Sequence, residues 1–191
     1  MKTDRDIIAG VLAGETRQFA LLVDRYKDRA FTLACHLLVN REEAEETVQD
    51  AFVRAFRSLA AFRHDAQFGT WFYRILYNAC MTRVARKRPG MIPLDDPDAG
   101  AMVSVVGQDI LSALDEVAAG ERVDVLYAEM EKLPEHFRAV IVMFYVQEQK
   151  YEEIAAILDV PVGTVKTHLF RARALLRKRM MKRFAEEMRA A

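Results

Sequence analysis

The stretch YEEIAAILDVPVGTVKTHLFRARALLRKRM, residues Tyr151–Met180, predicts two helices joined by a tight turn. In its first part, apolar residues recur at the spacing of one helix face: Tyr151, Ile154, Ala155 and Leu158. The segment Asp159–Gly163, with its proline and glycine, then breaks this pattern. We expect a second helix to begin near Thr164, whose hydroxyl can cap it, and to bury Val165, Leu169, Ala172 and Leu176. A short helix, a turn and a longer basic helix make a helix-turn-helix.

The outer face of the second helix carries side chains suited to DNA. They are Lys166, Thr167, Phe170 and Arg171, followed by Arg177 and Lys178. Nine Lys or Arg stand against two Asp or Glu between Val160 and Ala191, although the whole chain has 28 of each kind. A local positive excess can neutralise phosphates, and an aromatic ring can contact a thymine methyl group. The alternative is that Phe170 packs on a neighbouring helix and the basic residues only solvate the end of the chain.

The rest of the chain indicates an all-α protein of two small helical domains joined by a flexible acidic linker. Apolar residues recur at helical spacing in most segments, and no segment shows sustained strand alternation. The exception is Pro89–Gly120, which has three of the five prolines, four of the eight glycines, six acidic residues and no basic one. We therefore predict a first domain over 1–88, a linker over 89–120 and a second domain over 121–191.

The sequence contains little that predicts catalysis or a membrane location. No apolar run is long enough to span a bilayer, and no signal-peptide pattern opens the chain, so we expect a cytoplasmic protein. Cys35 and Cys80 lie far apart without metal-ligand spacing, which favours buried thiols over a redox switch. We find no phosphate-binding loop, zinc-protease motif or nucleophile elbow. The expectation is therefore no enzyme, no metal, no cofactor and no small-molecule substrate.

Two stretches of the first domain suggest partners. FRHDAQFGTWFYRILYNACMTRVARKR, Phe62–Arg88, has six of the eighteen aromatic residues, interleaved with or followed by arginines, and Thr70 can cap its helix. Aromatic faces stack on unpaired bases, but the same rings could equally form core. REEAEETVQDAFVRAF, Arg41–Phe56, begins with acidic residues, which indicate either a basic protein partner or only a solvated helix start.

In this order, the motifs resemble the extracytoplasmic-function (ECF) group of the sigma-70 family of sigma factors over almost the whole chain. AEETVQDAFVRAF resembles the family's polymerase-binding segment, and FRHDAQFGTWFYRILYNAC resembles the segment that melts and reads the −10 element. LPEHFRAVIVMFYVQEQKYEEIAAILDVPVGTVKTHLFRARALLRK resembles the module that binds the −35 element. Envelope-stress factors of the sigma-E type are the most similar. One departure is Lys150, where the family often has Ser or Thr before the tyrosine of this helix.

The resemblance implies a function and a set of site residues. The function is promoter-specific initiation by binding core RNA polymerase, through its β and β′ subunits, and promoter DNA. The resemblance also implies an anti-sigma factor that could hold the chain at a membrane. A pocket for a flipped-out −10 base would use Phe62, Ile75 and Asn78, with the DNA backbone near Arg74, Arg83, Arg86, Lys87 and Arg88. The −35 bases would meet Lys166, Thr167, Phe170 and Arg171, and the −35 phosphates Thr164 and Arg173. Core polymerase would bind Glu46, Gln49, Asp50 and Phe52.

Two other functions remain open from the residues alone. A helix-turn-helix regulator that acts without being a polymerase subunit would need neither Arg41–Phe56 nor the aromatic stretch. An enzyme acting on nucleic acids would need carboxylates or metal ligands clustered beside the basic surface, and the sequence indicates none. Binding to core polymerase separates the first of these from a sigma factor.

Overall fold

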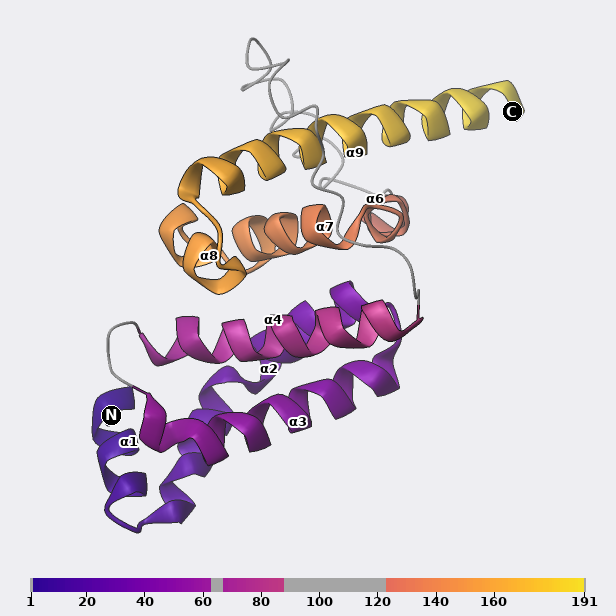
Figure 1. Ribbon diagram of the computed structural model, residues 1–191. Coiled ribbons are helices and arrows are strands. Elements are labelled where there is room, and N and C mark those ends of the chain that lie inside the picture. Colours follow the sequence, from indigo (N-terminus) through magenta and orange to yellow (C-terminus); the bar gives the residue numbers. More distant parts are fainter. Residues whose placement is uncertain (1, 63–66, 88–122, 191) are drawn as a thin grey trace.

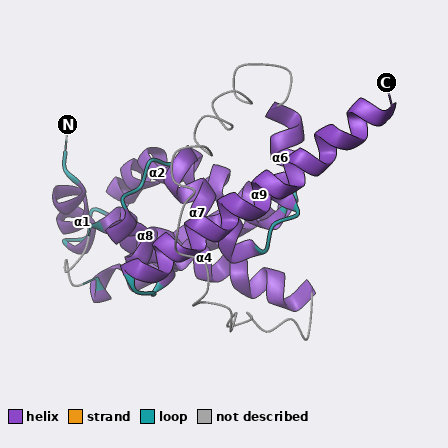
Figure 2. Ribbon diagram, turned by 90° about the horizontal axis from the view of Figure 1, so that it is seen from above, coloured by secondary structure: helices purple, strands orange, loops and turns teal. Residues whose placement is uncertain are grey.

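The computed structural model describes residues 2–62, 67–87 and 123–190, and all regular elements within them are helical (Figure 1). Figure 2 shows the same helices from above, joined by short loops. The predicted all-α fold of two small helical domains is therefore confirmed, including the helix-turn-helix at the end of the second. The predicted linker, 89–120, and Arg88 lie outside the described residues.

The first domain is built around one long central helix. Its elements are α1 (Asp4–Leu12), η1 (Thr16–Gln18), α2 (Phe19–Leu38), α3 (Arg41–Ser58), η2 (Leu59–Ala61) and α4 (Phe68–Lys87). Helix α2 packs against α1, α3 and α4, because its apolar residues recur at threes and fours. Leu22 and Leu33 of α2 and Phe72 and Leu76 of α4 are fully buried in the shared core.

A sharp corner between α2 and α3 directs the acidic start of α3. Val39 ends α2 in the left-handed region, with φ 57°, and its N–H donates to the carbonyl of Cys35. Asn40 then caps α3, since its side-chain oxygen accepts from the N–H of Glu43 at 2.9 Å. The carboxylates of Glu42 and Glu43 lie in the first turn, where they suit the positive end of the helix dipole.

The second domain places a long helix over three shorter ones. Its elements are α6 (Val123–Glu131), α7 (Glu135–Ile141), a π-helical turn η3 (Val142–Val146), α8 (Tyr151–Leu158) and α9 (Val162–Ala190). The predicted apolar stripe of α9 is buried: Val165 is 0% exposed, Leu169 2%, Ala172 0% and Leu176 3%. Helix α9 contacts α6, α7 and α8, and its C-terminal part extends beyond them (Figure 1).

Two helices begin before the residue expected to cap them, and a third begins without the expected Ser or Thr cap. Helix α9 begins at Val162, so Thr164 lies inside its first turn, and the carbonyl of Pro161 accepts from the N–H groups of Thr164 and Val165. Helix α4 likewise begins at Phe68, before the expected cap at Thr70. Helix α8 begins at Tyr151 despite Lys150, because the Glu153 carboxylate accepts from the Lys150 N–H at 2.9 Å and supplies half of a capping box.

The two domains lie against each other along α4 and α2 (Figure 1). Helix α4 contacts α8, and α2 contacts α7 and η3. No helix within residues 2–62, 67–87 and 123–190 combines the length and the apolarity needed to cross a membrane.

Candidate nucleic-acid interface

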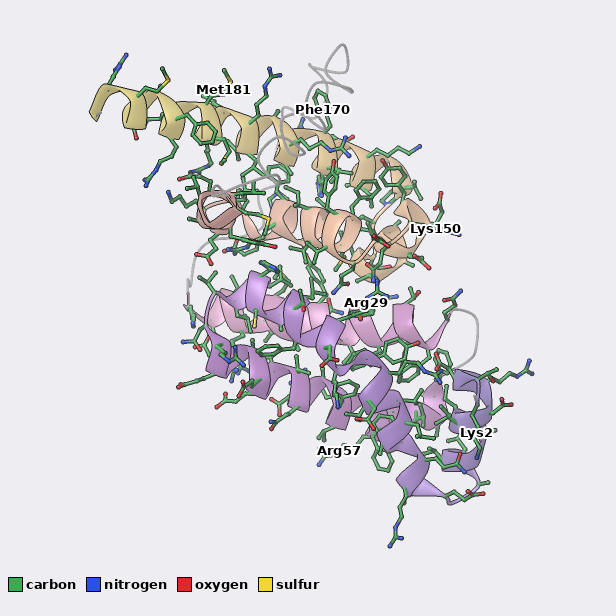
Figure 3. The ribbon with its side chains drawn as sticks, turned by 180° about the vertical axis from the view of Figure 1, so that it is seen from behind. Lys2, Arg29, Arg57, Lys150, Phe170 and Met181 are labelled. Carbon is green, nitrogen blue, oxygen red and sulfur yellow. The ribbon has the colours of Figure 1, made fainter. Side chains whose placement is uncertain are left out.

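The outer side of α9 presents the predicted −35-reading residues together. Lys166 is exposed, and Thr167, Phe170 and Arg171 are half-buried. Phe170 projects from the side of α9 that faces away from the rest of the protein (Figure 3). The Thr167 hydroxyl donates to the Gly163 carbonyl at 2.9 Å, so its oxygen can still accept a hydrogen bond. This face therefore offers cations, a hydroxyl and an aromatic ring on one helix.

Two cations of α9 rest on aromatic rings of the neighbouring elements. The guanidinium carbon of Arg173 lies 5.2 Å from the Tyr145 ring centroid and 5.7 Å from that of Phe144. The Lys166 ammonium lies 5.7 Å from the centroid of Tyr151. These distances are within the cation–π range.

Of the predicted −10 pocket residues, Ile75 and Asn78 lie on α4 and Phe62 follows η2. Phe62 is buried at 8% exposure, and its ring centroid lies 5.0 Å from that of Trp71. Ile75 is half-buried, and Asn78 is exposed, although its spacing places it on the same helical face as Trp71 and Ile75. Asn78 follows Trp71 by about 10 Å along the helix axis. The structure thus brings Phe62 to the start of α4 and leaves the Asn78 amide open to solvent.

The basic side chains of α4 have acidic partners. Arg83 donates to the Glu43 carbonyl at 2.9 Å, to the Thr47 hydroxyl at 3.1 Å and to the Glu46 carboxylate at 2.7 Å. Lys87 lies 2.6 Å from the Glu43 carboxylate. Arg83 and Lys87 therefore tie the end of α4 to the start of α3, whereas Arg86 is exposed.

The predicted polymerase-binding residues on α3 divide into two groups. Glu46, Gln49 and Asp50 are exposed. Phe52, however, is 7% exposed and stacks on Phe72 with ring centroids 4.3 Å apart, so it belongs mainly to the core. The apolar residues that α3 does expose are Val53, at 46%, and Phe56, at 41%. Sequence reasoning missed Val53 as an exposed apolar residue. The only signal in the sequence was that Val53 lies one residue after Phe52 and therefore on a different side of the helix.

Polar and aromatic contacts join the two domains within the described residues. Arg74 of α4 pairs with Asp159, in the turn after α8, at 2.8 Å. Arg29 donates to the Gln147 carbonyl, and the Gln147 amide donates back to the Arg29 carbonyl at 2.7 Å. Figure 3 shows Arg29 at the boundary between the domains. Two further contacts are a stack of His36 on Tyr127, with centroids 5.3 Å apart, and a 3.4 Å bond from Arg138 to the Leu37 carbonyl.

Burial governs the shifted pKa values near these surfaces. Desolvation lowers the pKa of His168, and the neighbouring His136 and Arg171 lower it further, so its neutral form is favoured beside the outer face of α9. Burial also raises the pKa of Cys80 to about 12, as expected for an inert thiol. Cys35 is only half-buried, which differs from the expectation of two buried thiols.

Metal-binding chemistry finds no support in the described part of the chain. Among residues 2–62, 67–87 and 123–190, no three His, Cys, Asp or Glu side chains are grouped so that they could hold a metal ion.

Known proteins match this chain along nearly all of its length. The family models Sigma-70 region 2 and Sigma-70, region 4 match residues 22–89 and 124–176. The ECF RNA polymerase sigma factor SigW of Bacillus subtilis is 38% identical over 177 residues, which are 91% of this chain and 94% of SigW. The ECF RNA polymerase sigma-E factor of Escherichia coli K12 is 34% identical over 179 residues, 90% of this chain and 91% of that protein.

Two solved structures share the fold. CnrH, solved in complex with the cytosolic domain of CnrY, superposes with a TM-score of 0.68 at 25% identity, covering 95% of this chain and 99% of CnrH. The sigma factor RpoE from Bartonella quintana, solved with the anti-sigma factor NepR, has a TM-score of 0.61 at 21% identity, with 86% and 98% of the two chains covered.

Substituting Arg83 should test whether this residue stabilises the fold by joining α4 to α3. Arg83→Ala should lower the free energy of unfolding by about 1–3 kcal/mol, because it removes the hydrogen bonds of a charged donor to the Glu43 carbonyl and the buried Thr47 hydroxyl. The matched control, Arg86→Ala, removes an exposed cation of the same helix and should change stability by less than about 0.5 kcal/mol. Urea denaturation of both variants measures the difference, and equal stabilities would contradict the anchoring role of Arg83.

Proposed function

Because the chain belongs to the ECF group of the sigma-70 family of RNA polymerase sigma factors, we propose that α9 reads a −35 duplex, α4 reads the −10 element and α3 binds core polymerase. Each assignment is a residue-level proposal supported by the geometry of one surface. The observation that carries the proposal is the outer face of α9, where Thr167, Phe170 and Arg171 lie away from the buried stripe and Lys166 lies at the edge of the face.

The −35 assignment is supported by the chemistry that each α9 side chain offers. Arg171 and Lys166 can donate to guanine edges, and Phe170 can meet a thymine methyl group. Arg173 and Thr164 lie at the margins of this face, where phosphates would pass on either side of the groove. Phosphate contacts set affinity, whereas base contacts set sequence preference, so the two groups should respond differently to substitution.

The −10 assignment is supported by the exposed amide of Asn78. An amide offers both a donor and an acceptor to the Watson–Crick edge of an unstacked base. Ile75 lies one turn away and is half-buried, and the Phe62–Trp71 pair lies at the start of the same helix. Arg74, Arg86 and Arg88 would follow the DNA backbone, together with Arg83 and Lys87 once their acidic partners release them.

The polymerase assignment is supported by an exposed acidic and apolar surface on α3. Glu46, Gln49 and Asp50 can meet basic groups of the β′ or β subunit. Phe52 would contribute from the core by fixing the helix, and we add Val53 and Phe56 as the apolar contacts, since they are the exposed ones. Phosphodiester chemistry would belong to core polymerase, so we assign no catalytic residue to this chain.

Spacing on DNA implies that the two domains separate during promoter binding. Elements named −10 and −35 lie about 25 base pairs apart, or about 85 Å along B-form DNA. A compact chain of this length has a radius of gyration of about 16 Å, too small to touch both elements at once. Arg74, which we assign to −10 DNA, is also paired with Asp159 while the domains touch. We infer that the contact described here represents the free chain and that polymerase holds the domains apart.

The other functional possibilities have less support. A regulator independent of polymerase is disfavoured, since matches to both sigma-70 regions and to ECF sigma factors extend over the whole architecture. We further propose a cytoplasmic location. We also propose an anti-sigma partner, since RpoE, which has a similar fold, was solved with the anti-sigma factor NepR. Co-purification with core polymerase tests the central proposal, and failure of the folded chain to bind it would overturn that proposal.

Substitutions at Arg171 and Arg173 should separate base reading from phosphate binding. Arg171→Ala should weaken holoenzyme binding by about 1–3 kcal/mol on some −35 sequences and little on others. Arg173→Ala should weaken binding evenly and reduce the slope of log K against log salt by about 0.9. Titration against a panel of −35 variants measures both, and equal losses on every variant would contradict the direct-reading assignment.

Replacing Asn78 should impair DNA melting without harming the fold. Since the amide is exposed, Asn78→Ala should change the free energy of unfolding by less than about 0.5 kcal/mol. Open-complex formation should fall, and discrimination at one −10 position should relax. Permanganate footprinting on single-base −10 variants measures this effect, with core-polymerase affinity as the control. A variant that melts all of them with wild-type preferences would remove Asn78 from the pocket.

Neutralising Asp159 should favour separation of the domains. Asp159→Asn keeps a residue that tolerates the left-handed backbone at this position, where φ is 59°, but removes the ion pair with Arg74. An exposed pair contributes about 0–1 kcal/mol, so affinity of the free chain for a single-stranded −10 oligonucleotide should rise by up to about fivefold. Asp24→Asn, which removes the exposed carboxylate paired with Lys27 on α2, is the matched control. Equal affinities of both variants would show that the pair does not mask the −10 surface.

A further inference from the structure

Three aromatic rings form a continuous surface beneath one flank of α9. The Phe144 ring stacks on Tyr151 with centroids 5.1 Å apart and an interplanar angle of 9°. Phe144 also meets Tyr145 edge to face, with centroids 4.9 Å apart. All three residues are half-buried, so their ring faces are partly available to a neighbour. We call Phe144, Tyr145 and Tyr151 the aromatic ledge.

A widened helical turn brings Phe144 and Tyr145 of the ledge together. After α7, residues Val142–Val146 form a π-helical turn, in which the N–H of Gln147 donates to the carbonyl of Val142 at 3.0 Å. A π turn holds more residues than an α turn, so consecutive side chains lie closer together around its axis. Phe144 and Tyr145 can therefore both face α9 while Val142 and Met143 are fully buried. Single π turns inside helices are frequent at functional sites.

The ledge supports two cations that belong to one side of α9. Lys166 and Arg173 are seven residues apart, or two helical turns, and so lie on the same flank. Arg173 lies over Tyr145 and Phe144, and Lys166 lies over Tyr151. The Nε atom of Arg173 is buried and has no hydrogen-bond partner among the described residues. The ring faces, rather than an acceptor, are thus the observed contacts that orient this guanidinium.

A ring holds a cation differently from a carboxylate. The α4 cations Arg83 and Lys87 are held by Glu46 and Glu43, which cancel their charge. An aromatic ring attracts a cation through its quadrupole and carries no net charge, so the cation keeps its full attraction for a phosphate. Such a ring also restricts a long side chain before binding, which reduces the entropy lost when DNA arrives.

We propose that the aromatic ledge positions α9 for −35 recognition, with Tyr145 orienting Arg173 and Tyr151 orienting Lys166. The ledge residues are positioning residues, since they act through the two cations rather than by touching DNA. This inference rests on the proposed −35 contacts of Lys166 and Arg173 and adds the residues that make those contacts effective.

The test compares Tyr145→Leu with Tyr145→Phe in holoenzyme reconstituted from the full chain and core polymerase. Affinity for a promoter duplex is measured between 50 and 200 mM salt, a range over which phosphate contacts strongly affect binding by a protein that makes about 6–10 of them. Tyr145→Leu should weaken binding by about two- to fivefold and reduce the salt slope by up to about 0.9, as expected for Arg173→Ala. Tyr145→Phe keeps the ring face and should bind as the unsubstituted protein does.

A double variant shows whether Tyr145 acts through Arg173. If it does, Tyr145→Leu combined with Arg173→Ala should bind no more weakly than Arg173→Ala alone, within about twofold. Additive losses, an unchanged salt slope for Tyr145→Leu, or failure of Tyr145→Phe to restore binding would each overturn the proposal. If Arg173→Ala itself has no effect, the −35 assignment fails, which is a separate outcome from failure of the ledge.

A second series covers the case in which Tyr145→Leu does not fold. Phenylalanines with increasing ring fluorination at position 145 retain the ring shape while weakening the negative ring face. Promoter affinity that falls with each added fluorine, with an unchanged melting temperature, would support the ledge. Affinity that is independent of fluorination would overturn it.

Discussion

The burial of one apolar stripe on α9 is the constraint on which the second domain depends. Val165, Leu169 and Ala172 occupy a single helical face, so their packing on α7 and α8 fixes the rotation of α9. Because successive residues of a helix are about 100° apart, a shift of one residue would turn Phe170 toward the core. The outward direction of the polar face is therefore a consequence of apolar packing rather than of any polar interaction.

The two domains hold their basic side chains in place by different contacts. A surface that receives phosphates needs cations that are ordered and still charged. In the first domain, Arg83 and Lys87 are ordered by carboxylates of α3, which link the acidic helix to the basic one and reduce the net field. In the second domain, Arg173 lies over an aromatic ring, which has no net charge and does not neutralise the guanidinium. The second domain also pairs some of its cations, as Arg179 with Glu129 and Lys182 with Glu186 show, so this contrast applies to Arg173 and not to the whole positive excess of α9.

Local patterns predicted most of the fold, and contacts between distant residues account for what they missed. The stripe of α9 follows from spacing alone, because burial repeats with the helical period. On α8 spacing predicted the burial of Ile154 and Ala155 but missed Ile157, which is 1% exposed. The pattern on α3 could not decide whether Phe52 or Val53 faces solvent, since that depends on the position of Phe72. The pairing of Arg74 with Asp159 joins residues 85 apart and has no local signal. The π turn was also missed, because Phe144 and Tyr145 continue an ordinary helical pattern.

The reciprocal bonds between Arg29 and Gln147 have a consequence for how reversible the domain contact is. Both acceptors are main-chain carbonyls, and the Gln147 amide is 2% exposed while the domains touch. When the domains part, water can replace each of these bonds, and the exchange changes the free energy by about 0.5–1.5 kcal/mol for the neutral Gln147 amide and by about 1.5–3 kcal/mol for the charged Arg29 guanidinium. Such a seam specifies one docking geometry but adheres weakly, as contacts between domains of one chain generally do. The directional hydrogen bonds specify where the two domains meet. Their replacement by bonds to water keeps the free energy needed to separate the domains small.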